Sequence, residues 1–132
     1  MSFLKKIFTS SNNESSNKPI TKININWIPL TDLGQLIDIQ NNSQKPILLF
    51  KHSTTCSISR MALKNFETEF DLKDKIDTYF LDLLKHRTIS NEIATQFDVI
   101  HQSPQIIFIK NGVVIYNTSH SDIDASKLEN FL

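Results

Sequence analysis

The residue with the most reactive side chain is Cys56, the only cysteine among the 132 residues of the chain. It lies in the stretch FKHSTTCSIS, residues 50–59, between a run of apolar residues and a segment with helical spacing. Ser59 stands where a second cysteine would complete a C-x-x-C pair, so no disulfide can form within the chain. Any thiol chemistry at this site therefore joins one sulfur of this chain to a sulfur from another molecule.

The sequence places Cys56 after a buried strand and at the start of a helix. Residues 46–51 (PILLFK) form a continuous apolar run, as expected for a central strand. From Cys56 to Phe70, apolar residues recur at helical spacing, and we expect them to form one face: Ile58, Met61, Ala62, Leu63, Phe66 and Phe70. The first N–H groups of a helix lack internal partners and carry partial positive charge. A sulfur at that position is stabilised as the thiolate, which is the attacking species in disulfide exchange.

Polar residues flank Cys56, whereas most free cysteines lie buried among apolar residues. We expect the hydroxyl residues before it to cap the helix and the two residues before those to add positive potential: Ser53, Thr54, Thr55, Lys51 and His52. The alternative is an inert, buried thiol, which the polar flanks disfavour.

The dipeptide Ser103–Pro104 precedes the apolar run QIIFIK, residues 105–110. In the inferred fold it faces the Cys56 loop, and a cis bond there presents the backbone groups of Ser103 to an extended substrate. The simpler alternative is a proline that only sets a turn before a strand. His101, two residues earlier, is a candidate modulator of the thiolate.

The remaining elements are predicted from periodicity. We expect a strand or a strand-like extension over 23–27, strands over 76–82, 105–110 and 113–119, and helices over 31–42, 88–97 and 121–132. Asn111–Gly112 between two β-branched runs predicts a type I′ turn and an antiparallel hairpin. The order β-α-β-α-β-α-β-β-α predicts an α/β fold of the thioredoxin-like type, with a mixed central sheet and helices on both faces. In the first helix, Leu33, Leu36 and Ile37 are expected to form one face.

Length and composition predict one ordinary globular domain. Fourteen basic residues balance fourteen acidic ones, so the chain lacks the basic excess of a nucleic-acid binder. We expect residues 1–19 to form a flexible leader and residues 20–132 to form a single thioredoxin-like domain. The first residues, MSFLKKIF, lack the apolar run of a secretory signal, and no run approaches the ~20 residues of a membrane span. Together with the single cysteine, these features favour a cytoplasmic location.

The four histidines are scattered, and no four ligands stand at metal-binding spacing, so we expect no metal site.

Taken together, the stretches LLFKHSTTCSIS, MALKNFE, YFLDLLKHRTISNEIA and HQSPQIIFIKNG resemble the thioredoxin superfamily. Within it they resemble the YtxJ-type bacillithiol-system redox-active proteins, the monothiol bacilliredoxins, and the resemblance covers roughly residues 25–132. It implies a monothiol thiol-disulfide oxidoreductase that removes bacillithiol, or a similar low-molecular-weight thiol, from mixed disulfides on protein cysteines. By this likeness Cys56 attacks, and Ser103 and Pro104 clamp the substrate. No cofactor is bound permanently, bacillithiol or another small thiol is the co-substrate, and a small thiol or a reductase resets the protein.

One residue departs from the family pattern, which usually has proline directly after the cysteine, where this chain has Ser57. Proline lacks an N–H, so Ser57 restores one and adds a hydroxyl, and either group can hydrogen-bond a thiolate. Thr55, Ser57, Ser59 and His52 are therefore the candidate thiolate-stabilising or motif residues.

Two other functions stay open on the sequence alone. A monothiol glutaredoxin-like protein, binding a thiol cofactor or an iron–sulfur cluster, shares the C-x-x-S pattern. Against it, Ser57–Ile58 replaces the small glycine expected after the cysteine, and residues 118–122 (TSHSD) replace the Gly-Gly-Asp signature after the hairpin. The third function is a non-catalytic thioredoxin-fold interaction module whose cysteine is incidental.

Overall fold

The computed structural model describes residues 25–42 and 44–132. The expected leader, residues 1–19, and the first residues of the expected domain lie outside this part. The described elements follow one another along the chain as β1 (Ile28–Pro29), α2 (Leu33–Asn42), β2 (Ile47–His52), α3 (Ser57–Glu69), β3 (Asp77–Asp82), α4 (Arg87–Gln96), β4 (Gln105–Lys110), β5 (Val113–Ser119) and the 3₁₀ helices η1 (His120–Asp122) and η2 (Ala125–Phe131).

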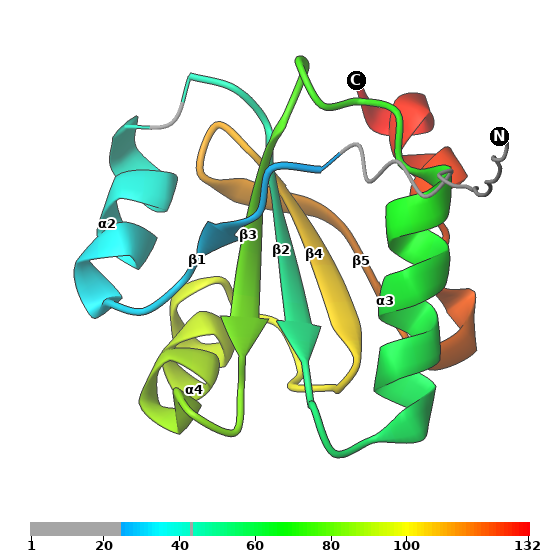
Figure 1. The fold of residues 1–132 in the computed structure, drawn as a ribbon. Coiled ribbons are helices and arrows are strands. Elements are labelled where there is room, and N and C mark those ends of the chain that lie inside the picture. Colours follow the sequence, from blue (N-terminus) through cyan, green and yellow to red (C-terminus); the bar gives the residue numbers. More distant parts are fainter. Residues whose placement is uncertain (1–24, 43) are drawn as a thin grey trace, which may run out of the picture.

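The strands form one five-stranded mixed sheet in the order β1-β3-β2-β4-β5. β1, β3 and β2 are parallel, whereas β4 and β5 run antiparallel to their neighbours. Helices α2 and α4 cover one face, and α3 with the 3₁₀ helices covers the other (Figure 1). This architecture confirms the predicted thioredoxin-like α/β fold.

The central strand β2 carries the site at its carboxyl end. All six of its residues are buried, as the continuous apolar run predicts. Successive side chains of a strand point to opposite faces. Leu49 accordingly packs in the core under α2 and α4, and Phe50 packs in the core under α3. By the same alternation Lys51 lies on the α4 side of the sheet and His52 on the α3 side.

The hairpin β4–β5 turns as its sequence predicts. Asn111 has a φ of 54° and Gly112 a φ of 78°, both in the left-handed region that a type I′ turn requires. A Cβ on Gly112 would also collide with the backbone carbonyl of Gln40, so the turn packs closely against the end of α2.

Two predicted elements are wrong in position or type. The first strand is not residues 23–27, because its described part, residues 25–27, is irregular, and pairing with β3 begins only at Ile28. Side-chain contacts hold this segment, since the Trp27 indole donates to Glu67 at 2.7 Å. The closing segment is not an α-helix but η1 and η2, separated by extended residues at Ile123 and Asp124. Asp124 caps η2 by accepting a hydrogen bond from the Ser126 N–H, so η2 begins as a separate helix after η1.

The predicted inner faces of α2 and α3 are partly wrong. In α2, Leu36 is buried, but Leu33 and Ile37 are 42% and 55% exposed. In α3, Phe66 is buried, but Ile58 and Met61 are 57% and 65% exposed. The apolar residues of each helix span a wider arc than the sheet can cover, so the periodicity alone does not decide which edge of the arc is buried.

Candidate functional site

Cys56 is the N-cap residue of α3, in the loop that follows β2. Its φ of −101° and ψ of 122° are extended, and its carbonyl accepts the first intrahelical bond, from Arg60 N–H at 3.0 Å. Its own N–H donates to the Ser53 carbonyl at 3.2 Å, which closes the loop into a tight turn. The Cys56 side chain makes no cap hydrogen bond, and the residue is partly exposed. Cys56 is therefore a partly exposed residue at the end of a helix whose first N–H groups have no internal partner.

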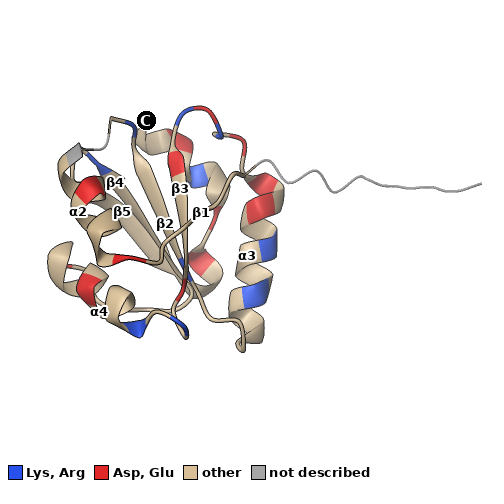
Figure 2. Cartoon of the chain, turned by 60° about the vertical axis from the view of Figure 1, so that its left-hand side comes forward, with Lys and Arg blue, Asp and Glu red and all other residues tan. Residues whose placement is uncertain are grey.

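The charges of α3 add to this positive end. The first turn holds no acidic residue. Arg60 lies in the first turn of α3 and Lys64 near its middle, whereas Glu67 and Glu69 lie in the last turn. The basic positions of α3 are therefore closer to Cys56 than the acidic ones (Figure 2). Arg60 also donates through Nη1 to the Thr54 carbonyl at 3.2 Å, and this contact holds a guanidinium against the Cys56 loop.

Ser59 occupies the place of a second thiol and is fully buried. Its hydroxyl accepts the Ser53 N–H at 3.0 Å and contacts His52 Nδ1 at 2.8 Å. Burial lowers the pKa of His52 below its ordinary value, although the Asp82 carboxylate opposes the shift. His52 is therefore neutral near pH 7, and Nδ1 can accept the Ser59 hydroxyl proton. Ser59 thus ties the loop before Cys56 to the end of β2.

The other two sequence-predicted residues beside Cys56 lie on the surface. Thr55 is exposed, and its hydroxyl lies 3.4 Å from that of Ser53. Ser57 is exposed at the first position of α3. Cys56 itself occupies the N-cap position, one residue after Thr55. Neither Thr55 nor Ser53 therefore caps the helix, in contrast to the prediction.

Lys51 lies on the opposite side of the sheet and is fully buried. Its Nζ is 2.8 Å from His101 Nδ1, and no Asp or Glu of the described residues forms an ion pair with it. Burial, followed by the charges of Lys51 and Arg87, lowers the pKa of His101, so its ring is neutral near pH 7 and Nδ1 accepts a hydrogen bond from Lys51 Nζ. The contact joins β2 to the loop that carries Ser103. In the sequence, the only signal for the contact between Lys51 and His101 was the position of His101 close to Ser103–Pro104.

Ser103–Pro104 lies directly before β4, and its peptide bond is cis. Pro104 is buried, and the Ser103 hydroxyl is buried without a hydrogen-bond partner among the described residues. Gln105, also buried, holds the loop through its side chain, which donates to the Ile100 carbonyl at 3.0 Å and accepts the Gln102 N–H at 3.3 Å. Ser103 itself stands outside the β4 ladder, which begins at Gln105.

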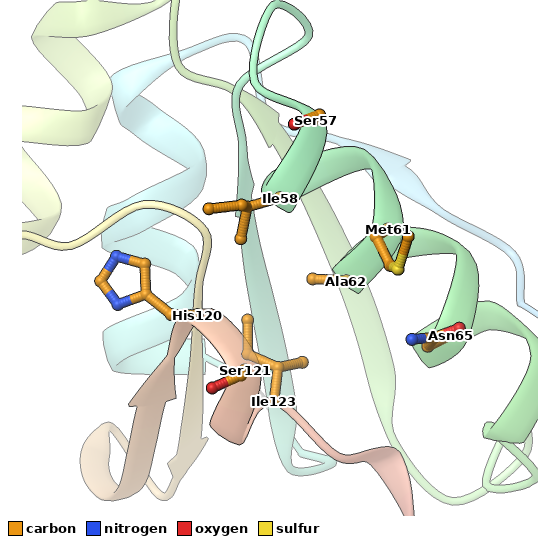
Figure 3. Close-up of a pocket in the computed structure, with 8 residues that line it drawn as sticks. All are labelled: Ser57, Ile58, Met61, Ala62, Asn65, His120, Ser121 and Ile123. Atoms are coloured by element: carbon orange, nitrogen blue, oxygen red, sulfur yellow. The ribbon is translucent and has the colours of Figure 1, made fainter.

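A groove beside Cys56 was not predicted from the sequence. It has a volume of about 340 Å³ and is lined by Ser57, Ile58, Met61, Ala62, Asn65, His120, Ser121 and Ile123. Five of these residues belong to α3, and the other three follow β5 (Figure 3). The exposed apolar residues of α3 were the signal, but their helical spacing assigned them to the core instead.

No group of three or more His, Cys, Asp or Glu residues within 25–42 and 44–132 is arranged to hold a metal ion. In the same part of the chain, no helix has the length and apolar character needed to cross a membrane.

An accessible thiol at the start of a helix that follows the central strand of such a sheet defines a one-cysteine member of the thioredoxin-fold oxidoreductases. The chain is similar to a solved structure described as a candidate oxidoreductase with a thioredoxin fold, at 33% identity and a TM-score of 0.68, over 78% of this chain and 90% of that one. It also shares the fold of thioredoxin from Malassezia sympodialis, at 23% identity, a TM-score of 0.60, and 78% and 84% coverage. Thioredoxin from Trypanosoma brucei brucei matches at 13% identity, a TM-score of 0.61, and 86% and 96% coverage.

The match to the family described as monothiol bacilliredoxin BrxC covers residues 28–128. The chain belongs to this family, which confirms the resemblance drawn from its motifs. It is a monothiol thiol-disulfide oxidoreductase, and of the three functions left open by the sequence the family match supports the first. Its partner in exchange is a thiol such as bacillithiol.

Replacing Lys51 by Met should stabilise the protein at neutral pH. Burial lowers the pKa of Lys51 from 10.5 to about 8. Between these values the unfolded chain binds more protons than the folded one, so the free energy of unfolding of the wild type rises with pH, by ~1–2 kcal/mol from pH 7.5 to 9.5. Lys51→Met removes the buried cation, so we expect a higher free energy of unfolding at pH 7.5 and a smaller rise. Urea unfolding at several pH values measures both.

The matched control is Lys64→Met, which removes a cation from the exposed surface of α3. Its free energy of unfolding should follow the pH dependence of the wild type. If the free energy of unfolding changes with pH in the same way for Lys51→Met and for the wild type, Lys51 is not buried as a cation.

Proposed function

We propose that Cys56 attacks bacillithiol mixed disulfides on cytoplasmic proteins and takes the small thiol onto itself. The placement of Cys56 carries this proposal: the residue is partly exposed and occupies the N-cap position of α3, where the first N–H groups have no internal partner. The Cys56 thiolate attacks the bacillithiol sulfur, the bond between the two original sulfurs breaks, and the client cysteine leaves as a thiolate. The products are a Cys56–bacillithiol disulfide and a free client thiol, so electrons and atoms balance within the exchange.

The second half-reaction resets Cys56. A second bacillithiol thiolate attacks the bacillithiol sulfur of the adduct, which releases the Cys56 thiolate and leaves bacillithiol disulfide. Ser59 supplies no resolving thiol, so the adduct persists until an outside thiol or a reductase arrives. Removing a small thiol from proteins is a reductive repair, which suits the reducing environment of the cytoplasm.

We assign supporting roles to the residues around the sulfur. The N–H groups of Ser57 and its successors in the first turn are donors toward the thiolate, and the Arg60 guanidinium adds positive charge. Ser59 and His52 hold the loop that carries Cys56. Ser103 contributes backbone groups outside the β4 ladder, and we assign to them the pairing with an extended substrate. Thr55 is exposed next to Cys56, and we assign it no contact with the sulfur.

Intact mass spectrometry tests the proposal. The protein is incubated with bacillithiol disulfide, glutathione disulfide and coenzyme A disulfide in parallel, and one adduct on Cys56 is expected, fastest with bacillithiol. A bacillithiol-modified client protein should lose the small thiol at the same rate at which Cys56 gains it. Reaction of Cys56 no faster than that of a free cysteine peptide would favour the non-catalytic module instead.

A further inference from the structure

The groove beside Cys56 carries a further function of the site. Its lining includes Ser57, the residue next to the reactive cysteine, and it continues along α3 for two helical turns to Asn65 (Figure 3). Positions 57, 58, 61, 62 and 65 lie on one side of a helix, away from the buried positions 59 and 66. The groove therefore begins at the residue that follows the cysteine of the mixed disulfide.

Two of the three large apolar side chains of this lining, Ile58 and Met61, are exposed. Ile58 is 57% and Met61 is 65% exposed, although both lie on a helix whose opposite side packs in the core. Ile123 and Ala62 complete an apolar floor between α3 and the segment after β5 (Figure 3). Exposed apolar side chains gathered around a concave surface mark a site for a partner.

We propose that this groove binds an apolar side chain of the client polypeptide, close to the modified cysteine, and not the small thiol. The inference rests on the proposed function, because the client approaches only when Cys56 attacks its mixed disulfide. During transfer three sulfurs lie in line, so the client sulfur is within ~4–5 Å of the Cys56 sulfur, about two S–S bonds. The polypeptide on either side of it must then lie against the surface around Cys56.

The spacing identifies which client residue reaches the groove. An extended chain advances ~3.3 Å per residue and places every second side chain on the same face, about 7 Å apart. One turn of α3, from Ser57 to Met61, advances about 6 Å. A client side chain two residues from its cysteine therefore meets Ile58 and Met61.

Charge separates the two possible occupants. None of the described residues that line the groove is Asp, Glu, Lys or Arg. The lining offers one imidazole, His120, so the carboxylates of an anionic small thiol would lose water there without gaining an ammonium or guanidinium partner. An apolar client side chain loses no such interaction, and it covers Ile58 and Met61.

Three peptides test the proposal, each with one bacillithiol-modified cysteine and with Leu, Ser or Asp two residues after it. The rate of Cys56 adduct formation is measured for each peptide and for bacillithiol disulfide alone. For the wild type we expect the Leu peptide to react about tenfold faster than the Asp peptide at low concentration, through KM. Met61→Lys places a cation in the groove, so the ratio of the Leu rate to the Asp rate should fall to one or reverse. A general effect of the new charge on the reactivity of Cys56 changes both rates by the same factor, so it does not change their ratio.

The matched control is Ile37→Lys, which changes an apolar side chain of similar exposure, 55%, on α2. It should keep the wild-type ratio and the wild-type rate with bacillithiol disulfide. Equal rates for the three peptides, or a ratio unchanged by Met61→Lys, would overturn the assignment. An equal change with the peptides and with bacillithiol disulfide would place the small thiol in the groove, which also overturns it. If Cys56 forms no adduct even with bacillithiol disulfide, the proposed function itself fails, and the assignment of the groove to a client side chain fails with it.

Discussion

Cys56→Ser should abolish transfer of the small thiol, lowering the rate of client repair by at least ~10³-fold, to the uncatalysed level. A serine hydroxyl does not ionise near pH 7 and forms no stable bond to a disulfide sulfur, so no adduct can accumulate. Serine has nearly the same shape and is a better N-cap residue than cysteine, and the N-cap is where Cys56 lies. The fold should therefore be kept, with a free energy of unfolding equal to or above that of the wild type. Adduct mass and client thiol titration measure the loss.

A relocated thiol is the control for the position of Cys56. In the double variant Cys56→Ser, Thr68→Cys, the single sulfur moves to an exposed site in the last turn of α3. Partial negative charge gathers at that end of a helix, so the thiolate gains no support there. We expect the reactivity of an ordinary free thiol and no client repair above that of a cysteine peptide. Repair at the wild-type rate would show that the start of α3 contributes nothing.

The sequence predicted the elements that set the position of the sulfur. The apolar run before Cys56 and the helical pattern after it are local signals, and each is strong enough to decide its own element. Asn111–Gly112 fixed the hairpin for the same reason, because positive φ at both residues admits few alternatives. The order of the elements then indicated a mixed sheet of the thioredoxin type, in which Ser103–Pro104 was expected to face the Cys56 loop.

Features that depend on tertiary contacts were not predictable in this way. Burial of Lys51 contradicts the usual behaviour of lysine, and its partner His101 lies fifty residues away in sequence. Ile58 and Met61 have the spacing of core residues, and only the packing of α3 shows that they line a groove. The role of Ser59 as a buried link to His52 was likewise hidden, because the sequence identifies it only as the residue that replaces a cysteine.

Ser59→Cys should convert the protein from a thiol acceptor into a dithiol oxidoreductase. Positions three apart on a helix have Cβ atoms about 5–6 Å apart, within reach of a disulfide after small adjustments. The new thiol would attack the Cys56 adduct as an intramolecular nucleophile, at an effective concentration of about millimolar or more. We expect the Cys56–bacillithiol adduct to fall at least tenfold and an internal disulfide, lighter by two hydrogens, to replace it in the mass spectrum.

The same substitution carries a cost in stability that a second variant isolates. The Ser59 hydroxyl accepts the Ser53 N–H and contacts His52 Nδ1, and a thiol is a weak replacement for both contacts. Ser59→Ala loses them without supplying a nucleophile, so it should unfold ~1–3 kcal/mol more easily than the wild type but accumulate the adduct normally. Loss of the adduct in Ser59→Ala would trace the effect to loop distortion, and a persistent adduct in Ser59→Cys would show that the two positions cannot meet. Loss in Ser59→Cys alone would mean that the absent second thiol is what makes this protein a carrier of the small thiol.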